Sequence, residues 1–171
     1  FLQLHHSIGK SMKICAFCGP ELIDEAKKVC DQAIPQTDFA KYAKDKKLAK
    51  KAINGFDFFV AQADIMPKVA QAFGKVLGPR GKMPNTKAGC VVPPKANLQP
   101  LYDKLQTTIR VSAKKDPVIQ LLVGNEEMKD EEIIDNIKTT YNQLIHHLPG
   151  EKNNIRNVFV KLTMGKPIKL L

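Results

Sequence analysis

Residues 12–31, MKICAFCGPELIDEAKKVCD, decide the fold class, because an apolar run is followed at once by a turn and a helical pattern. Residues 12–18 predict a buried strand, and Gly19 with Pro20 predicts the turn after it. Residues 21–31 follow as a helix with acidic residues in its first turn, where the helix dipole favours them. A buried strand followed by a helix is the unit from which parallel sheets are built.

The alternation of strand and helix continues beyond this unit. Residues 38–54 predict a helix, and residues 56–61 (FDFFVA) predict a second buried strand. Asp64 is positioned to cap a further helix, which is expected to end near Val76. Because successive buried strands are linked by helices, we expect this segment to form a small parallel α/β domain.

The rest of the chain predicts a mixed arrangement of helices and strands. A helix over residues 98–106 leads into strands at residues 107–113 and 118–123, which are expected to be antiparallel. A long amphipathic helix follows over residues 129–147, and alternation over residues 155–162 predicts a last strand. We expect this half to be an open α+β domain.

The composition excludes several classes of protein. The 171 residues include 27 Lys and Arg against 17 Asp and Glu, which gives a net charge of +10. A hydrophobic content of 43% is too high for a disordered basic tail, and no apolar run approaches the ~18 residues that span a bilayer. Four scattered cysteines do not make a disulfide framework and indicate a reducing cytoplasm.

Two basic stretches contain no acidic residue and are rich in Gly and Pro. They are residues 74–95 and 152–169, and each contains five Lys or Arg. Gly and Pro give a rigid backbone that a partner can approach closely, and unpaired cations attract a polyanion. Together the stretches predict that the protein binds a folded nucleic acid, with a soluble protein that merely carries positive charge as the alternative.

Two motifs that resemble enzyme sites fail in their details. Cys15 and Cys18 match C-x-x-C, but their odd spacing within a strand directs the thiols to opposite faces, so buried structural thiols are expected. Residues 78–83 (GPRGKM) resemble a P-loop, but Val76 replaces its first glycine and Met83 replaces its Ser or Thr. The four histidines form two adjacent pairs that do not converge on a metal. We therefore expect no catalytic residue, metal or cofactor.

Three groups of residues are candidates for RNA contact. Arg80, Lys82 and Lys87 lie where glycines would admit a phosphate backbone, with a solvated loop as the alternative. Thr163-Met164-Gly165 directly follows the predicted last strand and offers a hydroxyl, a thioether and bare backbone, which suits the shallow groove and 2′-hydroxyls of RNA. A plain turn is the alternative there. The lysines of residues 41–51 cover most of a helix, and solvation explains them better than phosphate contact.

Three blocks of the chain resemble the family of the large-subunit ribosomal protein L-one, which builds the mobile stalk beside the tRNA exit site. They are residues 77–85 (LGPRGKMPN) with 87–89 (KAG), the strand end at residues 123–124, and residues 154–160 (NIRNVFV) with 163–167 (TMGKP). The resemblance covers essentially the whole chain, and residues 93–98 (PPKANL) are more similar to archaeal members than to bacterial ones.

The resemblance implies two domains. An outer α+β open sandwich is made from both chain ends, residues 1–10 and 93–171, and residues 11–92 form an inserted, Rossmann-like α/β domain. The hinge crossings are expected at Gly9, Lys10, Pro93 and Pro94. Family members usually begin with a further helix and strand, whereas this sequence begins at Phe1, so the RNA contact made by those elements is absent or lies before it.

The resemblance places the main RNA contact on the outer domain. It implies that ribosomal RNA is bound by Thr163, Met164 and Gly165 with support from Arg156, Lys161 and Lys166, and more weakly by Arg80, Lys82 and Lys87. The sequence departs from the family at Leu162, where many members have Ser or Thr, and at Gln120, where bacterial members carry a histidine.

These implications define the expected function. The chain is expected to be a structural RNA-binding protein of the large ribosomal subunit, monomeric within the cytoplasmic ribosome, with no membrane and no small-molecule substrate. Its expected partners are a kinked junction in large-subunit ribosomal RNA, the exit-site tRNA whose release it assists, and its own messenger RNA, which it would repress. The alternatives are a non-ribosomal relative that acts in ribosome assembly and a small nucleotide-using α/β enzyme.

Overall fold

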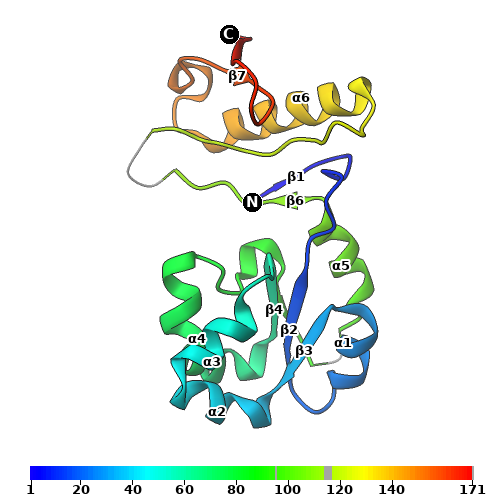
Figure 1. Ribbon diagram of the computed structural model, residues 1–171, viewed down its shortest axis with the longest axis vertical. Helices are drawn as coiled ribbons and strands as arrows, with labels where there is room; N and C mark the ends of the chain where they lie inside the picture. The colour runs from blue at the N-terminus through cyan, green and yellow to red at the C-terminus, as the bar shows by residue number, and fades with distance from the viewer. Residues whose placement is uncertain (95, 114–116, 171) are drawn as a thin grey trace.

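The molecule has two halves that lie end to end along its longest axis (Figure 1). The computed structural model describes residues 1–94, 96–113 and 117–170, apart from the side chains of Lys44, Lys46, Lys87 and Glu151. We call residues 14–106, which contain a four-stranded sheet, the α/β half. Residues 1–8 and 108–170, which contain a long helix and two small sheets, are the outer half. The N-terminus lies between the halves, and the C-terminus lies at the far end of the outer half (Figure 1).

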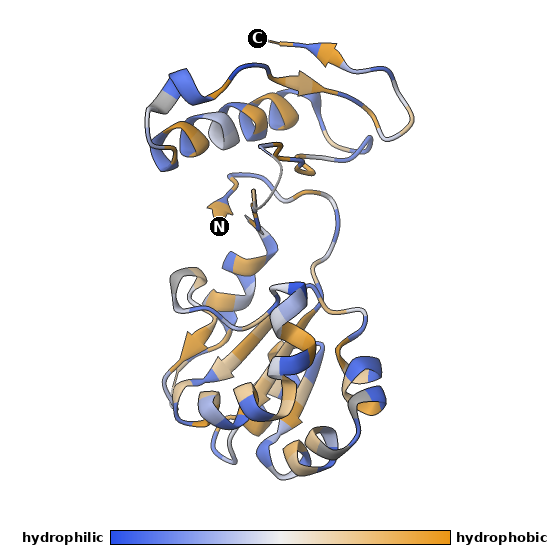
Figure 2. Ribbon diagram, turned by 90° about the vertical axis from the view of Figure 1, so that its left-hand side faces the viewer, coloured by the Kyte–Doolittle hydropathy of each residue, from blue (hydrophilic) through white to orange (hydrophobic). Residues whose placement is uncertain are grey.

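The parallel sheet forms because its two central strands are apolar on both faces. β2 (Ile14–Cys18) and β4 (Phe58–Gln62) are buried at every position, which is typical of strands covered by helices on both sides. The order is β3-β2-β4-β5 and every neighbouring pair is parallel, with β3 at Gln32–Pro35 and β5 at Val91–Val92. Figure 2 shows these strands as apolar ribbons enclosed by helices. The expected parallel α/β architecture is confirmed.

Helices cover both faces of this sheet, and each face has its own apolar cluster. One face is covered by α1 (Ile23–Val29) and α5 (Gln99–Gln106), and the other by α2 (Phe39–Lys44), α3 (Lys46–Ile53) and α4 (Met66–Arg80). In the second cluster, Phe17 stacks on Phe59 and packs on Phe73, with ring centroids 5.7 and 4.9 Å apart. Cys15 lies in this cluster and Cys18 in the other, so the predicted opposite orientation of the two thiols is confirmed.

The helix α5 packs with the α/β half, although the sequence assigned it to the outer domain. Leu98 and Leu105 are buried in the same cluster as Ile14 and Ala26. In addition, the Leu98 backbone N–H donates a hydrogen bond to Glu25 Oε1 at 3.2 Å. The apolar stripe of α5 therefore covers the sheet, because that face would otherwise be left open to water beyond α1.

The helical segment predicted over residues 38–54 is two helices. Asp45 separates α2 from α3 in an extended conformation, and its side chain accepts hydrogen bonds from the backbone N–H groups of Lys47 and Leu48. An aspartate in that position is a good N-cap, so it starts a second helix where the lysine pattern alone suggested a continuous one.

The helix α4 differs from its prediction at both ends. Asp64 lies in a short 3-10 turn before it and makes no capping bond, because its carboxylate accepts instead from Gln62 Nε2 at 3.3 Å. At the other end α4 continues past Val76 to Arg80, with Pro79 in its last turn. The short 3-10 turns are η1 (Gln36–Asp38), η2 (Ala63–Ile65), η3 (Thr86–Ala88) and η4 (Glu151–Asn154).

The outer half is organised around one long helix. This helix, α6 (Asp130–His147), forms where the amphipathic pattern predicts it. Its short antiparallel pairs are β1 (Leu2–Gln3) with β6 (Thr108–Ile109), and β7 (Phe159–Val160) with β8 (Ile168–Lys169). Both terminal segments therefore belong to the outer half, although the two termini lie apart in it (Figure 1).

The strands of the outer half are shorter than the sequence predicts. The strand expected over residues 107–113 is reduced to β6, and the one over 155–162 is reduced to β7. Residues 118–123 contain no assigned strand within the described part of the chain, so the predicted antiparallel pairing is wrong. Val118 and Leu122 remain exposed there. Alternating apolar residues show which side of a strand would be buried, but a strand also needs a neighbouring strand with which to form backbone hydrogen bonds.

Three carboxamide side chains fasten the N-terminal segment where strand pairing is short. A carboxamide has both a donor and an acceptor, so it can bond the N–H and the C=O of one backbone residue as a neighbouring strand would. The pairs are Gln143 on Gln3, Asn136 on His6, and Gln106 on Met12. The last of these joins the two segments that run between the halves.

Candidate nucleic-acid interface

The Thr163-Met164-Gly165 triplet forms the turn of a hairpin. The strands on either side pair Phe159 with Lys169 and Val160 with Ile168. The Gly165 N–H donates to the Leu162 carbonyl at 3.1 Å, which closes the turn. The prediction that the triplet follows the last strand is wrong, because the short strand β8 comes after it.

The side chains of this turn point into solvent. Met164 is 97% exposed, and the neighbouring Leu162 and Ile168 are 64% and 67% exposed. Thr163 is exposed as well. A side chain at position 165 would bring its Cβ within 3.2 Å of Leu162 Cβ, so glycine keeps the backbone accessible at that point. The turn thus presents a hydroxyl, a thioether and bare peptide on a projecting surface, which suits contact with ribose and base faces.

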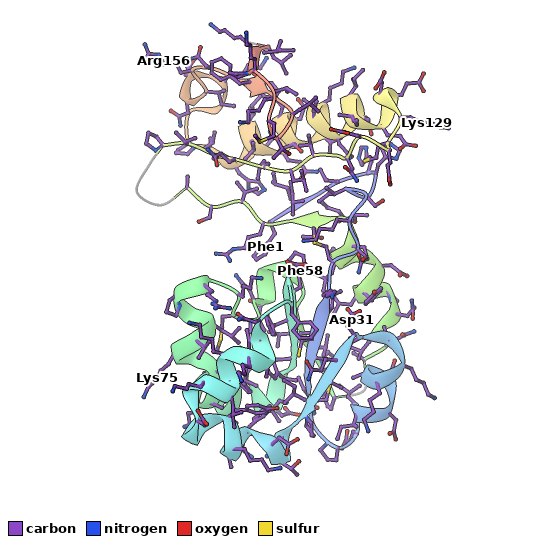
Figure 3. All side chains as sticks on the ribbon, in the orientation of Figure 1. Phe1, Asp31, Phe58, Lys75, Lys129 and Arg156 are labelled. Carbon is purple, nitrogen blue, oxygen red and sulfur yellow. The ribbon has the colours of Figure 1, made fainter. Side chains whose placement is uncertain are left out.

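The hairpin is surrounded by cations without acidic partners. Arg156, Lys161 and Lys166 are all exposed, and none of them makes an ion pair among the described residues. Figure 3 places Arg156 at the end of the molecule farthest from the α/β half. Residues 152–170 contain no Asp or Glu. Lys161 and Lys166 lie close to the turn, whereas Arg156 precedes β7 at the other end of the hairpin.

In the second predicted group, Arg80 and Lys82 bond to other parts of the protein. Arg80 lies in the last turn of α4, and its Nη1 donates to Asn54 Oδ1 at 2.7 Å. Lys82 Nζ donates to the Phe56 carbonyl at 2.6 Å and lies 3.8 Å from Asp57 Oδ1. Both cations are therefore engaged with the segment before β4. The backbone of Lys87 lies in η3, and its side chain is outside the described part of the structure.

The geometry of this segment also excludes a P-loop. A P-loop places its glycines and lysine before a helix, where the N-terminal N–H groups bind phosphate. Here Gly78 and Arg80 belong to the end of α4, and Gly81 is its C-cap in the left-handed conformation, with φ of 61°. The carbonyl end of a helix carries partial negative charge and repels phosphate.

A residue that the sequence did not single out links the two halves. Arg110 follows β6, and its Nη1 donates to the Arg80 carbonyl at 3.0 Å. Its guanidinium packs so closely on Gly81 that an added Cβ there would overlap it. These groups line a hollow of about 270 Å³ between the halves, together with Lys82, Asp57 and Leu121. No local pattern could have shown this, because residues 81 and 110 are joined only by the tertiary structure.

The predicted hinge residues occupy two different environments. Gly9 has φ of 78°, and its Cα approaches Asn125 so closely that a Cβ would lie 3.0 Å from Asn125 Cβ. Lys10 Nζ lies 3.8 Å from Asp57 Oδ2, beside the crossing. Pro93 is exposed, and Pro94 lines a surface hollow with residues of α1 rather than the space between the halves.

The cysteines have the properties of structural thiols. Cys15, Cys18, Cys30 and Cys90 are all free. Burial raises the pKa of Cys18 to about 12 and that of Cys30 to about 11, and it raises the pKa of Cys15 even further. The thiols are therefore protonated and weakly nucleophilic near neutral pH.

Comparison with known proteins gives a consistent result over the whole chain. The model of the ribosomal protein L1p/L10e family matches residues 1–166. The large ribosomal subunit protein uL1 of Methanobrevibacter smithii is 42% identical over 99% of this chain and 78% of its own length. The proteins of the same name from Nanoarchaeum equitans and Pyrococcus abyssi are 41% and 38% identical, over 100% and 98% of this chain and 81% and 74% of their own lengths.

These matches extend across both halves and leave little of the chain unaligned. The resemblance noted in the sequence, including its archaeal character, is therefore confirmed. Within the described residues, no helix has both the length and the apolar character needed to cross a membrane. The chain belongs to the ribosomal protein L1p/L10e family.

Proposed function

We propose that this chain is a structural RNA-binding protein of the cytoplasmic large ribosomal subunit, and that it binds ribosomal RNA through the hairpin turn at Thr163, Met164 and Gly165. The observation that carries the proposal is the exposure of Met164, which is 97% exposed on an acid-free hairpin. A thioether held in water by a closed turn gains apolar contact when it meets a ribose or base face.

The cations around the hairpin supply the remaining affinity. Arg156, Lys161 and Lys166 can each neutralise a phosphate and release its counterion, which makes the binding dependent on salt. The triplet then fixes the position of the hairpin on a folded RNA, because the turn and its exposed side chains fit only an RNA surface of complementary shape. Arg80, Lys82 and Lys87 are proposed as a weaker contact, since the first two also bond to the protein itself.

The two halves are proposed to be two domains that move relative to each other. The segments that cross between them meet at Met12 and Gln106, so we place the second crossing after Gln106 rather than at Pro93 and Pro94. Such a division supports a role in the release of exit-site tRNA, and the same RNA contact supports repression of the protein's own messenger RNA. No catalytic step is proposed.

The test combines Thr163→Val with Met164→Ala and measures binding to a stalk-junction RNA by filter binding. Loss of a hydrogen bond to a 2′-hydroxyl and of an apolar contact should weaken binding by about 2 to 4 kcal/mol. The matched control is Thr37→Val with Val118→Ala, which removes one exposed hydroxyl and trims one exposed apolar side chain elsewhere. Equal affinity of wild type and the hairpin variant would refute the proposed contact.

A further inference from the structure

The helices on the two faces of the parallel sheet differ sharply in charge. The sequences of α2, α3 and α4 contain nine Lys or Arg and no Asp or Glu. The sequences of α1 and α5, on the other face, contain three Lys and three acidic residues. Both sets of helices cover the same sheet, so the difference belongs to one surface and not to the α/β half as a whole.

Three lysines of α3 lie on the side of the helix that faces away from the sheet. Lys47, Lys50 and Lys51 are spaced at i, i+3 and i+4, which places them on one face. All three are exposed, whereas Ala49 and Ile53 of the same helix are buried in the apolar cluster of the sheet. The helix therefore presents a cationic stripe to solvent.

The helix α4 continues this stripe. Lys68 and Lys75 are seven residues apart and both exposed, so they lie on one side of the helix. Figure 3 shows Lys75 pointing away from the sheet. The Arg80 to Asn54 hydrogen bond of 2.7 Å ties the end of α4 to the end of α3. Exposed cations from both helices thus lie on the helical layer that covers one face of the sheet.

The acidic residues that border these helices have other partners among the described residues. Asp64 accepts from Gln62, and Asp57 lies 3.8 Å from both Lys10 and Lys82. Asp45 is occupied in capping α3, and Asp38 pairs with Lys41 at 2.9 Å. Among the described residues, Lys47, Lys50, Lys51, Lys68 and Lys75 make no ion pair. Like charges at i and i+4, as in Lys47 and Lys51, lower helix stability by a few tenths of a kcal/mol. The repulsion is relieved when an external polyanion binds.

We propose that α3 and α4 form a second phosphate-binding surface, which takes the backbone of an RNA duplex without regard to its sequence. The lysine ammonium groups reach individual phosphates as point charges, whereas these lysines lack the planar amide or guanidinium group that recognises a base edge through two parallel hydrogen bonds. The surface belongs to the α/β half and is separate from the hairpin turn, which lies at the opposite end of the molecule (Figure 1). It goes beyond the proposed function, because it does not depend on the hairpin contact.

Two separate surfaces on one molecule make RNA binding bivalent. Once the hairpin is bound, an RNA segment near α3 and α4 is present at high effective concentration, so contacts that are weak alone become significant. The surface would therefore act on a second RNA segment close to the one that the hairpin binds.

The experiment measures binding of the full chain to a plain RNA duplex that lacks the stalk junction, by fluorescence anisotropy over a range of salt concentrations. The variant replaces Lys47, Lys50 and Lys75 by Gln. The matched control replaces Lys27, Lys28 and Lys104 by Gln, which removes the same charge from the other face of the sheet. If each of the three lysines contacts a phosphate, the slope of log K against log salt becomes shallower by about 2.7 in the variant and stays unchanged in the control.

Three outcomes would overturn the proposal. Equal slopes in the variant and the control would show that only net charge matters, and an unchanged slope in both would show that the stripe is solvated. Tighter binding of wild type to phosphatidylserine vesicles than to the duplex, lost in the variant, would assign the surface to membranes instead. The Thr163→Val and Met164→Ala variant keeps duplex binding while it loses junction binding, so failure of the hairpin contact is distinguishable from failure of this surface.

Discussion

Replacing Asn136 by Ala should destabilise the outer half, because it removes three hydrogen bonds from a fully buried site. Asn136 Oδ1 accepts from the His6 N–H at 3.2 Å, and its Nδ2 donates to the carbonyls of His6 at 3.3 Å and Val123 at 3.0 Å. The side chain is 0% exposed, so water cannot replace these bonds without a rearrangement.

The magnitude follows from the bonds and from helix propensity. Each intramolecular hydrogen bond contributes about 1 kcal/mol net, so three contribute about 3 kcal/mol. Alanine has a better helix propensity than asparagine, which offsets about 0.5 kcal/mol at this position in α6. The free energy of unfolding should therefore fall by about 2.5 kcal/mol.

The assay is urea unfolding followed by circular dichroism, with hydrogen exchange to locate the loss in β1 and β6. Two variants on α6 serve as controls. Asn142→Ala changes the same residue type at an exposed position and isolates the propensity gain of about 0.5 kcal/mol. Thr140→Val removes a buried hydroxyl that has no hydrogen-bond partner among the described residues, so it should stabilise the protein by about 1 kcal/mol.

One pattern of results would refute this reasoning. If Asn136→Ala unfolds at the same urea concentration as Asn142→Ala, the three bonds do not hold the N-terminal segment on α6. If Thr140→Val lowers the free energy of unfolding as much as Asn136→Ala does, the effect comes from disturbing this face of α6 and not from losing the hydrogen bonds of the Asn136 amide.

Two further predictions concern the α/β half. The free energy of unfolding should fall as pH rises from about 9 towards 12. The pKa of the Cys18 thiol is near 9.0 in the unfolded chain and about 12 in the folded protein. In that pH range the unfolded state therefore binds fewer protons than the folded state, so rising pH favours unfolding. Urea titrations at several pH values should show this fall reduced in Cys18→Ala, and an identical fall in both proteins would contradict it. Gly81→Ala should lose about 1–2 kcal/mol from its positive φ, and more from overlap with Arg110. In an Arg110→Ala background only the first loss should remain, so equal urea midpoint shifts in the two backgrounds would disprove the contact.

The sequence predicted the parallel sheet and the long helix well, because both depend on local patterns. Residues 14–18 and 58–62 are apolar at almost every position, and such runs are stable only between two layers of helices. The stripe of α6 and the opposite orientation of Cys15 and Cys18 follow equally from the fixed periods of helix and strand. The family resemblance rested on contiguous blocks, which a sequence shows directly.

The sequence could not predict which partner each segment meets. The helix α5 carries an apolar stripe that would suit either half, and only its contact with Leu98, Ile14 and Ala26 assigns it to the α/β half. Residues 118–123 alternate as a strand should, yet without a neighbouring strand they form no ladder. Lys82 was expected to face a phosphate, but the Phe56 carbonyl lies within its reach.

Residue types and short-range spacing were enough to predict the buried strands β2 and β4, the long helix α6, the charge and the family, because these depend on local patterns. Only the tertiary structure shows that the Thr163 to Gly165 triplet is a hairpin turn and that Arg110 lies against Gly81. It also shows that exposed lysines of α3 and α4 lie on the helices that cover one face of the sheet. Those arrangements join residues far apart in the chain, and periodicity carries no information about which distant segment will complete a buried contact.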